Sequence, residues 1–263
     1  MRELERREAD SPSAPARVGV VGRGRLGTAL AAALHRAGVD VGGPVARAEV
    51  PVGDAILLCV PDGEIAAAAA AVAGAAPLVG HTSGATPLSV LEPASADAFG
   101  LHPLQTFAGR EGDAGRFAGA GCAIAGSTAT ALEAARSLAL RLGMLSFELP
   151  DERRGAYHAA ASIASNFVIT VEHAAESVAR RAGLEPDDAR RLLAPLVRAT
   201  VENWAELGPS RALTGPVARG DELTVAAQRA AVRAAEPRLV PLFDALVEQT
   251  RILAGGAGRR ESA

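Results

Sequence analysis

Three glycines spaced as Gly-x-Gly-x-x-Gly form the pattern in this chain that is best suited to chemistry. Gly22, Gly24 and Gly27 follow a short β-like run and open an alanine-rich helical pattern. At such a turn the first glycine permits a tight bend, the second leaves room for a pyrophosphate, and the third lets the helix pack closely on the strand. The helix N-terminus then offers free N–H groups to the phosphates. We therefore expect a dinucleotide site that includes Gly22, Arg23, Gly24, Arg25, Leu26 and Gly27, with a plain glycine-rich turn as the alternative.

The residues that would meet the adenosine ribose favour NADP(H) over NAD(H). An NAD site usually has Asp or Glu about 20 residues beyond the glycines. Counting on from Gly27 leads to Val45-Ala46-Arg47, which contains no acid. Arg47 is suited to a 2′-phosphate, with Arg23 and Arg25 adding positive charge. A solvated loop position for Arg47 is an equally weighted alternative.

Histidines supply the candidate proton donors, because the chain contains no lysine and all 27 basic residues are arginines. His81 and His102 each end a predicted strand, and ligands of open parallel sheets bind at the carboxyl ends of strands. A third histidine lies on a predicted helix. At 100° per residue it belongs to one polar stripe on that helix, formed by His158, Ser162, Ser165 and Asn166.

Reduction of a C=O or C=N group by hydride transfer needs a proton donor with a pKa near the working pH. His158 is the preferred donor, since an unperturbed histidine titrates near 6.5, and His102 is the reserve acid. Ser162 and Asn166 are expected to hydrogen-bond the substrate. The alternatives for the stripe are a helix face satisfied by a neighbouring domain and a histidine buried at a dimer interface.

Residues after two other predicted strands complete the expected cofactor site, namely Val60, Pro61, Thr82 and Ser83. Thr82 and Ser83 could hold the nicotinamide amide or the substrate, or instead cap the following turn with their hydroxyls. Farther along, Arg219 could clamp a substrate carboxylate. A loop salt bridge with Asp221, itself a predicted helix N-cap, is slightly preferred for Arg219.

The elements that must position these residues change in kind near residue 150. Up to that point β-like runs alternate with helical patterns, which predicts an α/β fold with a mainly parallel sheet covered on both faces. Beyond it only helices are expected, and Pro195 should kink or divide one of them. Strands are predicted at 17–21, 39–45, 55–60, 78–81, 98–101, 121–125 and 145–149. Helices are predicted at 25–37, 64–72, 128–142, 151–182, 186–207, 222–235 and 237–253. Gly255 is suited to the stop signal after the last of them.

This pattern predicts two domains between two tails. Residues 16–150 form a Rossmann-like dinucleotide-binding domain, and residues 151–254 form a helical domain for substrate binding and dimerisation. Residues 1–15 and 255–263 are expected to be disordered. Only nine residues, Ala46–Asp54, separate the second strand from the third, so the usual third strand and its helix do not fit. The adenine side of the cofactor site should therefore be open and the affinity poor.

Composition excludes several classes of protein. The 263 residues are 49% hydrophobic and 22% charged, which is typical of a globular protein and unlike disordered, collagen-like or coiled-coil chains. A net charge of −3 argues against a nucleic-acid partner. Cys59 and Cys122 lie in apolar runs and are expected to be buried thiols. Residues 65–79 are too short and too interrupted to span a bilayer, and the N-terminus lacks the apolar stretch of a signal peptide, so a cytoplasmic protein is expected.

Further motifs carry a resemblance to known families. The buried run 55–60 ends in Val-Pro-Asp, and with the glycine loop this resembles the superfamily of 6-phosphogluconate dehydrogenase, β-hydroxyacid dehydrogenases, ketopantoate reductase and pyrroline-5-carboxylate reductase. That resemblance implies an N-terminal Rossmann domain and an all-helical C-terminal domain. Over about residues 16–254 the chain more closely resembles an uncharacterised Rossmann-like oxidoreductase family whose helical domain has no known function. The motifs that carry this are His81-Thr82-Ser83-Gly84, Leu101–Phe107, Tyr157–Ala161, Ser165–Phe167 and Leu213–Asp221.

The chain also departs from those families. The β-hydroxyacid dehydrogenases and ketopantoate reductase use a helix-borne lysine with an asparagine nearby; Asn166 resembles the asparagine, whereas the place of the lysine is vacant. The first hypothesis is therefore an NADP-dependent reductase of a small keto acid or imine. The second is a non-catalytic dinucleotide-binding or regulatory protein on the same scaffold. The third is a hydrolase with zinc held by His81, His102 and His158, which no local histidine spacing supports.

A homodimer through the helical domain is expected as well. The predicted helix 151–182 is apolar over more than one face, as Ile163, Phe167, Ile169 and Val171 show. A helix of this kind needs burial on several sides, and three further helices do not readily supply it.

Overall fold

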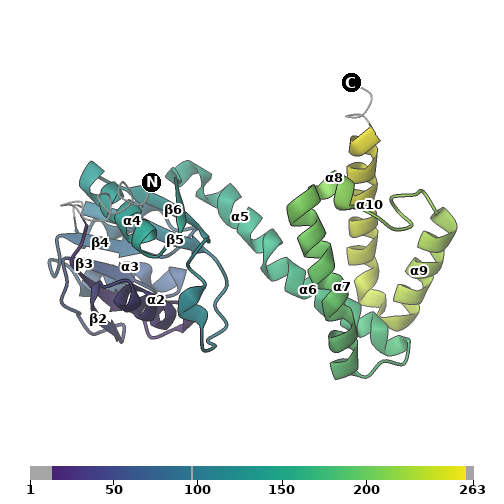
Figure 1. Cartoon of the computed structure of the whole chain (residues 1–263), viewed down its shortest axis with the longest axis horizontal. Helices are drawn as coiled ribbons and strands as arrows, with labels where there is room; N and C mark the ends of the chain where they lie inside the picture. Colours follow the sequence, from purple (N-terminus) through teal and green to yellow (C-terminus); the bar gives the residue numbers. More distant parts are fainter. Residues whose placement is uncertain (1–13, 96, 259–263) are drawn as a thin grey trace. The chain divides into compact units, whose positions relative to one another are not determined.

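The chain forms two compact units (Figure 1). The computed structural model describes residues 14–95 and 97–258. The first unit extends to Ser165 and the second begins at Asn166. Most of the tail expected at residues 1–15 lies outside the described residues. The domain boundary expected near residue 150 and the observed division differ by one helix, because α5 (Arg154–Ala164) belongs to the first unit.

The first unit contains a seven-stranded sheet with the order β2-β1-β3-β4-β5-β6-β7. All neighbouring strands are parallel except β5 and β6, which are antiparallel. The mainly parallel sheet expected from the sequence is therefore confirmed. The strands are β1 (Arg17–Val21), β2 (Asp40–Val45), β3 (Ala55–Leu58), β4 (Leu78–His81), β5 (Asp97–Leu104), β6 (Gly121–Gly126) and β7 (Leu145–Glu148).

Helices cover both faces of this sheet. On one face, α2 (Arg25–Arg36) and α4 (Ala129–Arg141) pack in one core with Leu57 and other strand residues. On the other face, α3 (Ile65–Ala71) packs with Ile56 and Leu58. The short 3₁₀ helix η2 (Leu88–Leu91) packs in that second core too. Successive residues of β3 thus contribute to opposite cores, as the alternation of side chains along a strand requires.

The connection from β2 to β3 is as short as the sequence predicts. Residues 46–54 lead from β2 directly to β3, which pairs with the other side of β1. Among the described residues no strand pairs with the outer edge of β2. The adenine side of a conventional dinucleotide site is therefore reduced in this fold.

One strand is longer than expected, and this changes the place of a candidate site residue. β5 was expected to end at Leu101, whereas it continues to Leu104. It does so because β6 pairs with it along its whole second half, for example Pro103 with Cys122. The parallel neighbour β4 ends opposite Gly100. His102 therefore lies within β5 and not at its end, although it still lies beyond the carboxyl end of β4.

The second unit is entirely helical in its described residues. It consists of α6 (Asn166–Arg181), α7 (Pro186–Leu207), α8 (Pro209–Ala212), α9 (Glu222–Ala235), η5 (Pro237–Leu239) and α10 (Val240–Gly258). Its buried apolar side chains, among those described, are few: Ala189, Val225, Val232 and Val247. Across the described residues, no helix has both the length and the apolar character that a membrane crossing requires.

Two helix predictions are wrong in detail, and of the kink or division predicted at Pro195 the division does not occur. The helix expected at 151–182 is divided into η4 (Asp151–Arg153), α5 and α6, with Ser165 in a non-helical conformation between the last two. Serine and asparagine side chains compete for backbone hydrogen bonds and so favour such breaks. Pro195 does not divide α7, since a proline removes one backbone hydrogen bond and the turns on both sides remain. α10 continues past Gly255 to Gly258, beyond which the predicted tail lies outside the described residues.

Candidate functional site

The glycine loop joins β1 to α2, and its three glycines differ in the space that surrounds them. Gly22 has a φ of +114°, and a Cβ there would lie 2.2 Å from the carbonyl oxygen of Cys59. A Cβ on Gly27 would lie 2.0 Å from the carbonyl oxygen of Gly22. A Cβ on Gly24 would meet no atom within 4 Å. Packing within the protein therefore requires the first and third glycines, whereas at Gly24 the structure leaves open space of the kind that a pyrophosphate needs.

The N-terminus of α2 is suited to an anion. Gly24 is its N-cap residue, no side chain caps the helix, and its first turn contains no acidic residue. The first helical hydrogen bond runs from the N–H of Thr28 to the carbonyl oxygen of Gly24 at 3.0 Å. The N–H groups that precede it have no partner within the helix, so they favour negative charge at this point.

The other residues expected to bind the cofactor lie along the same edge of the sheet. In the parallel register Val21 pairs with Leu58, and Leu58 pairs with His81. The carboxyl ends of β1, β3 and β4 are thus side by side. Thr82–Ser83 follow β4 directly, and Val60–Pro61 begin two residues after the end of β3. Both segments therefore lie at the edge where the glycine loop lies.

The hydroxyls of Thr82 and Ser83 are used inside the protein. Thr82 donates to the carbonyl oxygen of Leu58 at 3.3 Å. The Oγ of Ser83 accepts from the backbone N–H groups of Ala85 and Thr86 at 3.1 and 3.0 Å. Both side chains are buried. Of the two roles predicted for Ser83, this geometry matches the capping of the following turn.

Two of the arginines expected to attract a 2′-phosphate already have carboxylate partners. The guanidinium of Arg23 lies 3.3 Å from both carboxylate oxygens of Glu49. Arg47 forms an ion pair with Glu64. Glu49, two residues after Arg47 in the loop beyond β2, was not among the expected site residues. It would have been identified if the usual spacing of about 20 residues after the glycines had been applied with more tolerance.

A cluster of ring side chains lies beyond the end of β4. The Nδ1 atom of His102 is 2.6 Å from the hydroxyl oxygen of Tyr157, and the two rings meet edge to face with centroids 5.4 Å apart. The loop after β4 closes the other side, because a Cβ on Gly84 would lie 2.9 Å from Cε1 of His102. Tyr157 was not among the expected site residues. Two signals pointed to it: Tyr157 opens the motif Tyr157–Ala161 that carries the family resemblance, and this single tyrosine of the chain adjoins His158.

His158 belongs to the same cluster. Its ring centroid is 6.4 Å from that of His102, and its buried Nδ1 atom has no hydrogen-bond partner within residues 14–95 and 97–258. Ser162 lies one turn farther along α5. Asn166 begins α6 in the second unit, so the four residues of the expected stripe do not share one helix.

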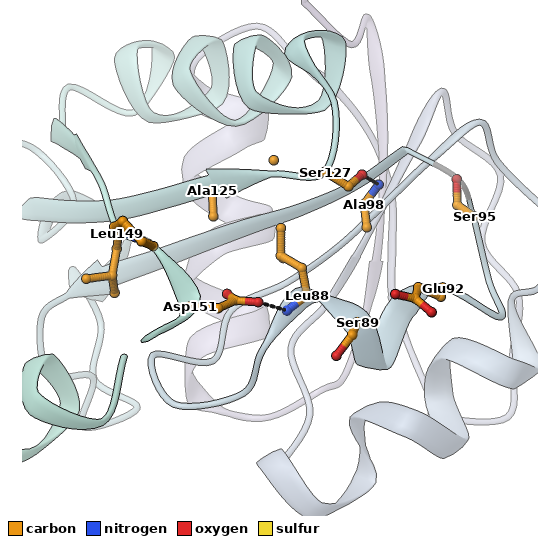
Figure 2. A pocket seen from close by; sticks show the side chains of 11 residues that line it. Leu88, Ser89, Glu92, Ser95, Ala98, Ala125, Ser127, Leu149 and Asp151 are labelled. Carbon is orange, nitrogen blue, oxygen red and sulfur yellow. Dashed lines mark hydrogen bonds between the residues drawn. The ribbon is translucent and has the colours of Figure 1, made fainter. Parts of the chain in front are cut away.

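Arg154 places a buried positive charge beside these rings. Its side chain is 4% exposed, and its Nε donates to Asp151 at 2.5 Å. Its Nη1 donates to the carbonyl oxygen of Ser83 at 3.4 Å. The second oxygen of Asp151 accepts from the N–H of Leu88 at 3.1 Å, as Figure 2 shows. Arg154 thus ties the start of α5 to the loop after β4.

Burial shifts the pKa values of His81, His102 and Tyr157 toward the neutral forms of these side chains. It lowers the pKa of His81 to about 4, with Arg154 adding to the shift. It also lowers the pKa of His102 to about 4, with His158 and Arg154 contributing. Burial and the nearby Cys122 raise the pKa of Tyr157 to about 12. At neutral pH His102 is therefore a neutral imidazole beside a neutral hydroxyl.

A groove of about 480 Å³ runs beside β5, β6 and η2 (Figure 2). No sequence motif predicted it. Asp151 is common to this groove and to the contacts of Arg154. The groove is lined by Leu88, Ser89, Glu92, Ser95, Ala98, Ala125, Gly126, Ser127, Leu149, Pro150 and Asp151.

Two remaining expectations concern Arg219 and metal ions. Asp221 caps α9 by accepting from the backbone N–H of Thr224 at 3.1 Å, which confirms its predicted N-cap role. Arg219 is exposed and forms no ion pair with Asp221 within the part of the chain that the structure describes. In that same part, no group of three or more His, Cys, Asp or Glu side chains is arranged to hold a metal ion. The zinc hypothesis thus has no structural support.

Comparison with known proteins agrees with this architecture. Residues 120–250 match the family described as Domain of unknown function (DUF2520), and no curated protein matches the chain. A proposed NADP oxidoreductase from Bacteroides fragilis has a TM-score of 0.76 and 24% identity, covering 91% of this chain and 98% of its own. Pyrroline carboxylate reductase from Plasmodium falciparum, solved with NADP bound, has a TM-score of 0.57 and 12% identity over the same shares of the two chains, 91% and 98%.

A third solved structure extends the comparison. The reductive aminase from Aspergillus terreus, in complex with NADPH and ethyl levulinate, has a TM-score of 0.58 and 18% identity over 89% of this chain and 93% of its own. At these identities the likeness concerns the fold, and it extends over the sheet and the helices alike. The chain therefore has the fold of these solved structures, a Rossmann-like sheet unit followed by a helical part, and its residues 120–250 match the DUF2520 family.

Proposed function

We propose that this protein is an NAD(P)-dependent oxidoreductase that reduces the C=O or C=N group of a small molecule, such as a keto acid or an imine. The observation that carries the proposal is the open space at Gly24 in front of the uncapped N-terminus of α2. The steric needs of the fold explain Gly22 and Gly27 but not Gly24. A dinucleotide pyrophosphate would explain Gly24.

The residues on the carboxyl edge fit such a cofactor. Backbone N–H groups from Gly24 onward would bind the pyrophosphate, and Val60–Pro61 and Thr82–Ser83 would line the path toward the nicotinamide. When bound, the nicotinamide would supply the hydride. A preference for NADP(H) is part of the proposal, and it requires Arg23 or Arg47 to exchange its glutamate partner for the 2′-phosphate.

The chain's own residues would bind the substrate and supply the proton. His158 is the proposed proton donor, supported by its buried Nδ1, which has no hydrogen-bond partner among the residues that the structure describes. A buried polar atom without a partner costs free energy that a bound ligand can restore. Ser162 and Asn166 are proposed to hydrogen-bond the substrate. His102 is less suited to donate a proton outright, because its pKa of about 4 leaves little imidazolium at neutral pH.

A homodimer through the helical unit is also proposed. Ile169 on α6 is 71% exposed and Leu196 on α7 is 65% exposed. Side chains of this kind, together with the few buried residues of the unit, favour a partner surface. A second copy would cover apolar area that one chain leaves open.

One alternative function has its own support. Without a lysine, and with Arg23 and Arg47 already paired to glutamates, the scaffold also suits a dinucleotide-binding protein that has no catalytic turnover. The two functions differ in turnover and agree in binding.

Both functions require dinucleotide binding, and calorimetric titration of the wild type and of Gly24→Val with NADPH and NADH tests it. We expect the wild type to bind and Gly24→Val to lose binding, since a side chain there would fill the space of the pyrophosphate. Gly115→Val is the matched control, because Gly115 is also exposed and unhindered but lies outside the loop. Normal binding by Gly24→Val would refute the cofactor site. A screen of keto acids and imines for NADPH oxidation then separates the enzyme from the binding protein.

A further inference from the structure

We propose that Tyr157 is a positioning residue that holds His102 in one neutral tautomer, so that the Nε2–H of His102 donates a hydrogen bond to the carbonyl oxygen or imine nitrogen of the substrate. This inference rests on the proposed function and deepens it. It assigns the two histidines of the cluster different tasks. His102 polarises the group to be reduced, and His158 supplies the proton.

The imidazole of His102 is fixed from three directions. Its backbone is held in β5, where His102 pairs with Ala123 of β6. The backbone of Gly84 lies so close to the ring that a Cβ would approach Cε1, Nε2 and Nδ1 to 2.9, 3.0 and 3.1 Å. The hydroxyl of Tyr157 lies 2.6 Å from Nδ1. A ring held in this way keeps one orientation, which a directed hydrogen bond to a substrate requires.

The hydrogen bond runs from the hydroxyl of Tyr157 to Nδ1. Its length of 2.6 Å is typical of an O–H donor and shorter than the usual N–H donor distance. The Nδ1 of His102 is also the hydrogen-bond partner that the structure gives the Tyr157 hydroxyl. If Nδ1 carried the proton, the hydroxyl would donate to no group in the described part of the chain. A neutral imidazole that accepts at Nδ1 must carry its proton at Nε2.

The surroundings keep the imidazole neutral. The charged or titratable groups that act on it are His158 and Arg154 on α5, Asp62 in the short 3₁₀ helix η1 (Asp62–Glu64) and the Tyr157 hydroxyl. Burial, His158 and Arg154 disfavour the imidazolium, and Asp62 opposes them only in part. A neutral imidazole can donate a hydrogen bond that stabilises the charge developing on a reacting oxygen. Triosephosphate isomerase uses a histidine in this way, and a helix N-terminus keeps that histidine neutral. Such a donor serves at neutral pH without first binding a proton.

The tautomer can be measured directly, without cofactor or substrate. In the full chain labelled with ¹⁵N-histidine, we expect His102 to show a pyridine-type Nδ1 and a pyrrole-type Nε2 at pH 7. His102→Gln assigns the signals by removing them, and His35→Gln removes those of an exposed histidine. In Tyr157→Phe we expect a mixture of both tautomers. A pyrrole-type Nδ1 in the wild type, or an unchanged single tautomer in Tyr157→Phe, would overturn the proposal.

Kinetics give the second measurement. Tyr157→Phe keeps the ring that meets Phe147 and His102 and loses only the hydroxyl. We expect kcat to fall about 10-fold to 100-fold while the Kd for NADPH is unchanged. Gly84→Ala, which displaces the imidazole and leaves Tyr157 intact, should show the same pattern, so the test does not depend on one variant folding. An unchanged kcat in both variants would overturn the proposal. A wild type that binds no dinucleotide would overturn the proposed function, and the spectra would still decide the role of Tyr157.

Discussion

The guanidinium of Arg23, in the glycine loop, lies 3.3 Å from both carboxylate oxygens of Glu49, in the loop after β2. The pair is exposed, with 61% and 53% of the two side chains accessible. Exposed pairs of this kind contribute at most about 1 kcal/mol. A 2′-phosphate could therefore displace Glu49 at little cost, and the same carboxylate could bind ribose hydroxyls instead.

Glu49→Gln should raise the affinity for NADPH relative to NADH by about threefold to fivefold, because it frees Arg23 and removes a negative charge that repels the phosphate. Calorimetric Kd values for both cofactors measure the ratio. Glu111→Gln, an exposed acid outside the loop, should leave the ratio unchanged. An unchanged affinity ratio in Glu49→Gln would mean that the Arg23–Glu49 pair does not take part in cofactor selection.

His158→Ala should lower the turnover of a true substrate by about 100-fold or more, since a positioned general acid contributes about 10²–10⁴-fold. The Kd for NADPH should barely change, because His158 lies on α5 and not in the glycine loop. Asn166→Ala should have a smaller effect, as it would orient the substrate. His173→Ala, an exposed histidine of α6, is the control. Full activity in His158→Ala would mean that another residue donates the proton.

Stability should fall as the pH is lowered from about 6.5 to 4. Burial holds the pKa values of His81 and His102 near 4 in the folded state, against about 6.5 in the unfolded chain. Groups with a lowered folded pKa contribute stability above the unfolded value, and this is lost as the pH falls toward the folded value. Urea unfolding at several pH values should show a shallower acid slope for His102→Gln than for the wild type, and no change for His35→Gln. Equal slopes in all three would contradict the assignment.

The hydroxyl of Tyr157 should not ionise until well above pH 10. Its pKa of about 12 follows from burial and from Cys122, and free tyrosine titrates near 10. The chain has one tyrosine, so the absorbance of tyrosinate near 295 nm reports this residue alone, and circular dichroism in the same samples checks that the protein stays folded. Titration near pH 10 in the folded protein would mean that the hydroxyl is exposed.

Sedimentation should show a dimer at micromolar concentration. Ile169→Glu should shift the protein toward the monomer, because it introduces a charge into an apolar surface that is proposed to meet a second copy. Leu140→Glu replaces a half-exposed leucine of α4 in the first unit and should leave the dimer intact. A wild-type monomer at that concentration would refute the proposed assembly.

Local patterns were enough to predict the sheet and the glycine loop. The seven strands and the βα turn at Gly22 are encoded by alternation, chain length and glycine spacing within short segments. The features that were missed depend on partners far away in the sequence. β5 extends past Leu101 because β6 pairs with it, and the pairing of Tyr157 with His102 joins residues that are 55 positions apart. No local periodicity can reveal a contact of that kind.

The close approach of Gly84 to the ring of His102 links two positions of the sequence. A Cβ at residue 84 would lie 2.9 Å from Cε1 of His102, so a side chain there requires the imidazole to move. Among related sequences, those that keep histidine at position 102 should keep glycine at 84, and those that lose the histidine should be free to gain a larger residue there. Such co-variation would separate the relatives that retain this cluster from those that have given it up.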